Sequence, residues 1–268
     1  MRAVLIKVAP TENETAVAVL WEAGTLGIEE RGAELVAYFE DDGIGLDELR
    51  QALPGATIEP AAIPDVDWVA RFRENFRAFG VGGFWITPVW DAGAPPPPGH
   101  RRLIVDPGRA FGTGTHESTA LCLQALEETA ARATLGRVLD VGTGSGILAI
   151  AARMLGARSV VAGDNDPESI ESAREHARQN GTAVHIVRAD GGRPFTPGRF
   201  DTVVANITAP LLIERAAELS VLPATPGRLI LAGLLADERA AVRSAYSGFP
   251  IARDRVSGEW GSLILERS

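Results

Sequence analysis

The sequence contains a single cysteine, Cys122, among 268 residues. One cysteine excludes an internal disulfide and every metal site built from several cysteines. Long apolar runs are also missing, since no stretch approaches the roughly 18 consecutive apolar residues that a membrane span requires. Residues 1–8 lack the apolar core and the small-residue cleavage site of a secretory signal. We therefore expect a soluble, cytoplasmic globular protein with no metal and no membrane contact.

Positive charge is scarce at the N-terminal end. Residues 1–65 contain 13 acidic and 4 basic residues, whereas residues 66–268 contain 22 of each sign. The whole net charge of −9 therefore belongs to the first quarter of the chain. Such a field attracts a basic partner and repels nucleic acid, so direct nucleic-acid binding is not expected. An acidic face that only keeps the protein soluble explains the same pattern.

Residues 1–62 predict a small α+β domain. The expected elements are strands at 3–8, 27–30, 34–39 and 57–61 and helices at 11–22 and 46–53. Thr11 and Glu14 predict a capping box at the start of the first helix. The order strand, helix, strand, strand, helix, strand is that of a ferredoxin-like sandwich. Because these residues carry no chemical motif, we interpret them as a substrate-recognition domain.

Residues 63–80 are interpreted as a connecting helix. Trp68, Phe72, Phe76 and Phe79 recur at helical spacing between arginines, which favours a helix packed through its aromatic face and acting as a hinge. An aromatic and basic stripe is also typical of nucleic-acid binding. Further along, four consecutive prolines, Pro95–Pro98, fit either a domain linker or a hairpin loop inside the second domain.

Residues 81–268 predict an α/β domain. Strands and helices alternate from residue 137, with strands at 138–141, 160–162, 184–187, 200–205 and 228–231. Repeated βα units imply a mainly parallel sheet with helices on both faces, the Rossmann-like architecture. Residues 249–256 and 262–266 predict a closing hairpin.

A glycine-rich turn lies between the first of these strands and its helix. Gly142, Gly144 and Gly146 allow a sharp turn and a close approach of ligand to backbone. NAD, FAD and S-adenosylmethionine sites all use such turns. The G-x-G-x-G spacing differs from the G-x-G-x-x-G of dinucleotide sites, and Asp140 just before the turn would repel a pyrophosphate but suit a cationic ligand. These features favour S-adenosylmethionine over an NAD-dependent oxidoreductase.

The next strand ends in an acidic cluster. Asp164 lies about 20 residues beyond the glycines, where an acid accepts the ribose hydroxyls of a bound nucleoside. Asp166, followed by Pro167, fits the N-cap of the next helix better than Asp164 does. Asp190, after the third strand, is expected either beside the adenine or in a solvated loop.

Two further segments resemble one known family. Residues 106–116 read D-P-G-R-A-F-G-T-G-T-H, and residues 206–211 read N-I-T-A-P-L. Together with the glycine-rich turn and Asp164, they resemble the bacterial ribosomal protein L11 methyltransferases over nearly the whole chain. The resemblance implies a class I S-adenosylmethionine-dependent methyltransferase domain. It also implies that a monomeric enzyme methylates lysine side chains and the N-terminal α-amine of a basic large-subunit ribosomal protein.

The resemblance also implies particular roles. The residues expected to contact S-adenosylmethionine are Thr119, Gly142, Gly144, Asp164 and Asn206. A loop formed by Phe111, Gly112, Thr113 and Gly114 is expected to close over its methionine end. Asn206 is the catalytic candidate, because its side-chain oxygen or the carbonyl of Ile207 would orient the acceptor amine. His116 fits a general base or a helix cap.

Other functions share parts of this pattern. Methyltransferases of glutamine, RNA or DNA adenine resemble the chain in their cofactor half but favour an Asn-Pro-Pro-Tyr type run after the fourth strand, which is absent here. A different protein or RNA acceptor remains an alternative. So does a non-catalytic S-adenosylmethionine-binding module of ribosome assembly.

Overall fold

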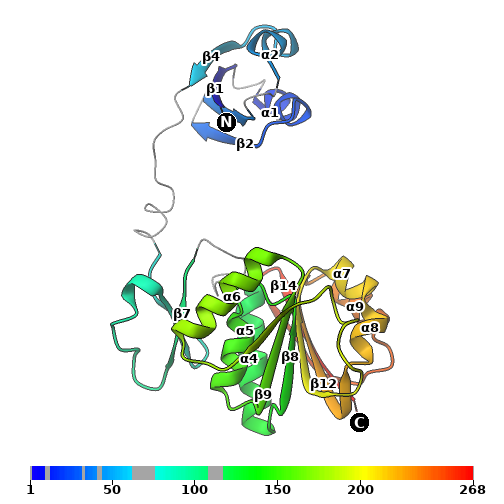
Figure 1. Ribbon diagram of the computed structural model, residues 1–268. Coiled ribbons are helices and arrows are strands. Elements are labelled where there is room, and N and C mark those ends of the chain that lie inside the picture. The colour runs from blue at the N-terminus through cyan, green and yellow to red at the C-terminus, as the bar shows by residue number, and fades with distance from the viewer. Residues whose placement is uncertain are drawn as a thin grey trace. The chain divides into compact units, whose positions relative to one another are not determined.

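A computed structural model of the chain describes residues 2–9, 13–31, 34–40, 44–61, 76–107 and 117–267. The chain divides into two compact units, Met1–Trp68 and Val69–Ser268 (Figure 1). The predicted connecting helix lies outside the described residues up to residue 75. At its described end the expectation is wrong, because Phe79 begins a β-strand that pairs with the next strand of the second unit.

The first unit contains four strands and two helices. They are β1 Arg2–Lys7, α1 Asn13–Glu22, β2 Gly27–Arg31, β3 Glu34–Phe39, α2 Leu46–Ala52 and β4 Thr57–Ala61. The strands form an antiparallel sheet in the order β2-β3-β1-β4. The predicted ferredoxin-like order is therefore confirmed, while the proposed cap at Thr11 lies outside the described residues.

This unit has a hydrophobic core of its own. Ile6 of β1 and Leu35 of β3 are fully buried, and so are Leu20 of α1 and Leu49 of α2. All four belong to one apolar cluster made only of residues from this unit. Burial of apolar surface between sheet and helices is the main force that stabilises such a small sandwich.

The second unit is built on a seven-stranded sheet. Its strands are β8 Arg137–Val141, β9 Ser159–Asp164, β10 His185–Arg188, β11 Phe200–Asn206, β12 Pro223–Leu235, β13 Ile251–Ser257 and β14 Trp260–Arg267. Their order is β10-β9-β8-β11-β12-β14-β13. The first five run parallel, and β14 runs antiparallel to both of its neighbours. The predicted Rossmann-like sheet and its closing hairpin are confirmed.

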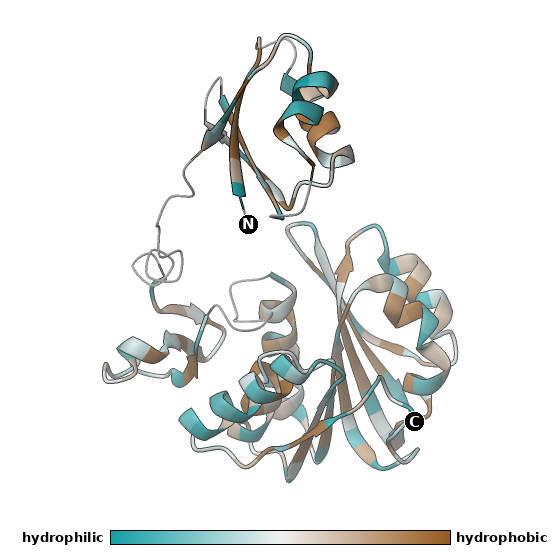
Figure 2. Cartoon of the chain, turned by 45° about the horizontal axis from the view of Figure 1, so that its top comes forward, coloured by the Kyte–Doolittle hydropathy of each residue, from teal (hydrophilic) through white to brown (hydrophobic). Residues whose placement is uncertain are grey.

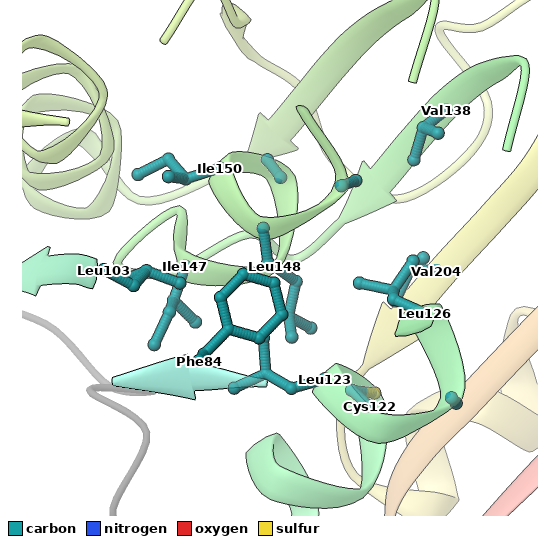
Figure 3. Close-up of a cluster of buried hydrophobic side chains, with 14 of the residues drawn as sticks. Phe84, Leu103, Cys122, Leu123, Leu126, Val138, Ile147, Leu148, Ile150 and Val204 are labelled. Carbon is teal, nitrogen blue, oxygen red and sulfur yellow. The ribbon is translucent and has the colours of Figure 1, made fainter. Parts of the chain in front are cut away.

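Helices cover both faces of this sheet (Figure 1). One face carries α4 Glu117–Arg132, α5 Ile147–Met154 and α6 Pro167–Gln179, and the other carries α7 Ala209–Glu214, α8 Ala216–Ser220 and α9 Arg239–Ala245. The strands between the two layers are mostly hydrophobic, because both of their faces are buried (Figure 2). On the first face the Phe84 ring lies among Leu123, Ile147 and Leu148 (Figure 3).

Phe84 belongs to a second, three-stranded sheet of β5 Phe79–Val81, β6 Phe84–Pro88 and β7 Arg101–Val105, with a 3-10 turn, η2 Val89–Asp91, after β6. β5 and β6 are antiparallel, but β6 and β7 are parallel. The four prolines therefore lie neither in a domain linker nor in a hairpin loop. They belong to a crossover of about a dozen residues, the length that parallel strands require.

Candidate functional site

A cleft opens at the carboxyl ends of the central strands, where the strand order reverses between β8 and β11. Such a switch point is where open α/β sheets bind ligands. The cleft has a volume of about 80 Å³. Its lining residues are Val141, Gly142, Asp164, Asn165, Ala189, Asp190, Gly191, Ile207, Leu211 and Arg215.

The glycine-rich turn is fixed by backbone hydrogen bonds to β9. The N–H groups of Gly142 and Thr143 both donate to the carbonyl of Gly163, at 2.9 and 3.1 Å. The turn then leads directly into α5, which begins after Gly146. The strand–turn–helix that the sequence predicts is therefore present at one wall of the cleft.

Asp164 is held at the tip of β9 by two backbone donors. Its Oδ2 accepts the N–H of Gly144 at 2.9 Å, and its Oδ1 accepts the N–H of Asp166 at 3.1 Å. A carboxylate offers about four lone pairs, so two remain for other donors. The helix cap is Asp166, which accepts from the N–H groups of Glu168 and Ser169. Asp164 is thus oriented toward the cleft without serving as the cap.

Asp190 also lines the cleft and has a partner that the sequence did not indicate. Its Oδ1 accepts from Arg215 Nη2 at 2.7 Å, and Arg215 Nη1 lies 3.1 Å from Oε1 of Glu218. The Asp190 side chain is nevertheless 68% exposed, so a place beside the adenine stays a prediction next to the solvated loop. No local motif marks Arg215, since it lies 25 residues away in the chain.

Asn206 and Thr119 meet although they are 87 residues apart. Asn206 ends β11, and its Nδ2 donates to Oγ1 of Thr119 at 3.3 Å. Thr119 lies in the first turn of α4 and is fully buried. Oδ1 of Asn206 is buried and has no hydrogen-bond partner within the described part of the chain. Such an oxygen costs free energy until a donor reaches it, which is a property of ligand-binding groups.

The predicted closing loop is not part of this geometry. Phe111, Gly112, Thr113 and Gly114, together with His116, lie outside the described residues. Their expected contact with the methionine end stays a prediction.

Asp140 lies beneath the glycine-rich turn instead of in the cleft. Its side chain is 1 % exposed, and its Oδ2 accepts from the Thr143 hydroxyl at 2.6 Å. Its Oδ1 is buried and has no hydrogen-bond partner within the described residues, so the expected contact with a cationic ligand stays a prediction. Burial raises the pKa of Asp140 from 3.8 to about 6, although the hydrogen bond from Thr143 opposes the shift.

This raised pKa predicts an unusual pH dependence for one variant. The folded protein binds the Asp140 proton more tightly than the unfolded chain, so this group lowers the free energy of unfolding as the pH rises from about 4 to about 6. Asp140→Asn keeps an acceptor for Thr143 and removes the charge. We expect it to be more stable than the unchanged chain at about pH 7.5, by at most about 3 kcal/mol, with the difference shrinking below about pH 6 and vanishing below the unfolded pKa of 3.8. Urea unfolding at several pH values measures this, and a pH-independent difference would contradict it.

Within the described residues no group of three or more His, Cys, Asp or Glu side chains could hold a metal ion. None of the helices there is long and apolar enough to cross a membrane.

The sheet order, the antiparallel β14, the glycine-rich turn and the acidic tip of β9 together define a class I methyltransferase domain of the Rossmann-like type. Residues 6–268 match the family described as "Ribosomal protein L11 methyltransferase (PrmA)". The chain belongs to this family.

Individual relatives agree with this assignment. The chain is 38% identical over 282 residues to the "Ribosomal protein L11 methyltransferase" of Myxococcus xanthus, covering 96% of each chain. It is 43% identical over 218 residues to the protein of the same name from Geobacter sulfurreducens, covering 79% of this chain and 69% of the relative. The crystal structure of a ribosomal protein L11 methylase from Lactobacillus delbrueckii subsp. bulgaricus is similar, with a TM-score of 0.65 and 32% identity, over 72% of this chain and 100% of that chain.

Proposed function

We propose that this protein transfers methyl groups from S-adenosyl-L-methionine to amino groups of ribosomal protein L11, at lysine side chains and the N-terminal α-amine. Membership of the L11 methyltransferase family supports the acceptor. The main evidence for this cofactor is the Asp164 carboxylate, which the N–H of Gly144 fixes at the carboxyl end of β9. The side chains of Asn206 and Thr119 meet at the end of β11, the strand that pairs with β8.

The residues of the cleft fit this nucleoside. When bound, it supplies a methyl group carried on a positively charged sulfur. Asp164 has lone pairs left to accept both ribose hydroxyls, and Asp190 offers a second acceptor in the cleft lining, suited to an adenine amino group. Ile207 and Leu211 add apolar surface for a purine ring. Asp164, whose carboxylate is not paired with Arg215, also favours a ligand of positive charge.

The acceptor amine needs orientation more than it needs a base. A free lysine has a pKa of about 10.4 and an α-amine of about 8, and partial desolvation lowers both. Two oxygens lie together beside Gly233: a Cβ added there would be 2.4 Å from the Ile207 carbonyl oxygen and 3.0 Å from Oδ1 of Asn206. Two neighbouring acceptors can hold two N–H groups of an amine and so direct its lone pair. We assign this positioning to Asn206 and Ile207.

Gly233 is expected to be essential to this arrangement. Its φ is +83°, and the methyl group of Gly233→Ala would collide with the Ile207 carbonyl. The collision displaces the acceptor oxygens but leaves Asp164 in place. We therefore expect kcat to fall at least about tenfold, with little change in the Kd of S-adenosylmethionine. Gly248→Ala is the matched control, because an added Cβ there meets nothing within 4 Å. Equal kcat values for the two variants would contradict the assignment.

We also propose that residues 1–62 recognise L11, that residues 63–80 connect the domains and act as a hinge, and that residues 81–268 carry the transfer. The net charge of −9 in residues 1–65 supports attraction of a basic protein.

The predicted result is that residues 1–62, which have their own core, bind L11 when expressed alone. The affinity should fall steeply between about 0.05 and 0.3 M salt. Fluorescence titration measures it, and binding found wholly in residues 81–268 would reject the idea.

Mass spectrometry of L11 tests the proposed reaction itself. Purified L11 is incubated with the protein and S-adenosylmethionine, and methylated lysines and a methylated N-terminal residue are expected. If the protein binds both L11 and S-adenosylmethionine but L11 stays unmethylated, the result would instead support a non-catalytic module. Methylation of ribosomal RNA in a parallel incubation would point to the alternative acceptor.

A further inference from the structure

The inner side of helix α6 carries a buried histidine that joins two distant backbone segments. His176 is 1 % exposed. Its Nδ1 lies 2.7 Å from the carbonyl oxygen of Ser145, in the glycine-rich turn, and its Nε2 accepts the N–H of Asp106 at 2.7 Å. A carbonyl can only accept and an amide N–H can only donate. The ring is therefore neutral, with its proton on Nδ1.

Helix α6 also packs against the glycine-rich turn at Gly146, the residue after Ser145. Gly146 has a φ of +80°, and a Cβ added to it would lie 3.1 Å from the Cα and 3.0 Å from the Cβ of Ala173, one turn before His176 on α6. On the other side of Ser145, the N–H of Gly144 donates to Asp164. The three residues 144–146 are thus held between the carboxylate of Asp164 and the surface of α6.

Asn180, the C-cap of α6, provides a natural comparison. Asn180 accepts the N–H of Ile104 at 2.8 Å and donates to the carbonyl of Ile104 at 2.7 Å. Asn180 and His176 therefore both fasten α6 to the end of β7. Only His176 also reaches the glycine-rich turn.

We propose that His176 is a positioning residue for the cofactor turn: its Nδ1–H holds the Ser145 carbonyl, and so keeps the Gly144 N–H directed at Asp164. The inference rests on the proposed function, since it assumes that S-adenosylmethionine binds at this turn. Loss of the Nδ1 donor frees the peptide between Ser145 and Gly146 and loosens the bond that orients Asp164. Cofactor affinity then falls, while binding of the protein acceptor is unaffected.

Two substitutions separate the two bonds of the ring. In His176→Asn the amide nitrogen stands at the position of Nδ1, so the donor to Ser145 is kept and the acceptor for Asp106 is lost. In His176→Gln the amide oxygen stands at the position of Nε2, so the acceptor is kept and the donor is lost. Both leave part of the ring's volume empty, so their loss of packing is similar. Asn180→Ala serves as the control for loosening of β7, together with loss of the bond from Asn180 Nδ2 to the His176 carbonyl, while the His176 ring is left intact.

The measurements are the Kd of S-adenosylmethionine by calorimetry, the KM for L11 and the unfolding temperature. We expect His176→Gln to bind the nucleoside about tenfold more weakly than the unchanged chain, the size of one lost hydrogen bond. His176→Asn and Asn180→Ala should stay within about threefold, and the KM for L11 should not change. Similar Kd values for the two His176 variants, at similar unfolding temperatures, would overturn the proposal, because packing alone would then explain them.

The tautomer of His176 can be measured on the unchanged chain, so this test does not require that any variant folds. The ¹⁵N chemical shifts of the His176 imidazole at about pH 7 should report the neutral Nδ1–H tautomer. The Nε2–H tautomer would overturn the proposal, since it cannot donate to Ser145. Failure of the unchanged chain to bind S-adenosylmethionine would instead overturn the proposed function, and the inference with it.

Discussion

Asp164→Ala is expected to weaken binding of S-adenosylmethionine by at least about 100-fold. Two hydrogen bonds from ribose hydroxyls to a charged acceptor contribute about 1.5–3 kcal/mol each, and about 1.4 kcal/mol corresponds to a tenfold change in affinity. The variant also removes the acceptor of the Gly144 N–H, so the turn loses an anchor. Calorimetric titration with the nucleoside measures the effect directly.

The control for Asp164→Ala lies two residues away. Asp166→Asn also removes one negative charge from the end of β9, but it keeps an acceptor for the first N–H groups of α6. It should bind the nucleoside within about threefold of the unchanged chain, because a surface charge screened by solvent and salt contributes little. If both variants weakened binding equally, general electrostatics would explain the result and the specific role of Asp164 would fail.

Asn206→Ala is expected to abolish methyl transfer while the fold stays intact. The variant removes the Oδ1 acceptor proposed to orient the amine, together with the donor to Thr119. Loss of one preorganised polar contact at a reacting group typically lowers kcat about 100- to 1,000-fold. The Kd of S-adenosylmethionine should rise by less than about tenfold, since Asp164 is untouched. Single-turnover transfer of a labelled methyl group to L11 measures the step.

Thr208→Ala is the matched control for Asn206. Thr208 stands at the N-cap of α7, in the same segment after β11, but its side chain makes no capping hydrogen bond. It should retain nearly full activity. Turnover of a folded Asn206→Ala protein at the rate of the unchanged chain would refute the assignment of the amine to Asn206.

Local features of the site were predictable from the sequence. The glycine-rich turn, the Asp166 cap and Pro167 at the first turn of α6 each depend on neighbours within a few residues, where the backbone requirements of turns and helix ends act. The alternation of strands and helices likewise predicted the parallel sheet. A resemblance to one family was needed to associate Thr119 with Asn206, because no local pattern joins two residues 87 positions apart.

Other features depend on tertiary structure and had no local signal. The sequence did not show that Asp140 would be buried with its Oδ2 bonded to the Thr143 hydroxyl. Arg215 pairs with Asp190, 25 residues away in the chain, and His176 bonds to Ser145, 31 residues away. The direction of β7 relative to β6 was also misjudged, because prolines mark an irregular segment without showing which way the chain returns.

The proposed function requires that the carboxylate of Asp164 holds the sugar of a sulfonium nucleoside in the cleft. A crystal structure of the protein grown with S-adenosylmethionine tests it most directly. The predicted result is both ribose hydroxyls within hydrogen-bond distance of Asp164, with the adenine toward Asp190. An empty cleft under saturating nucleoside, or a sugar bound to other residues, would contradict the account.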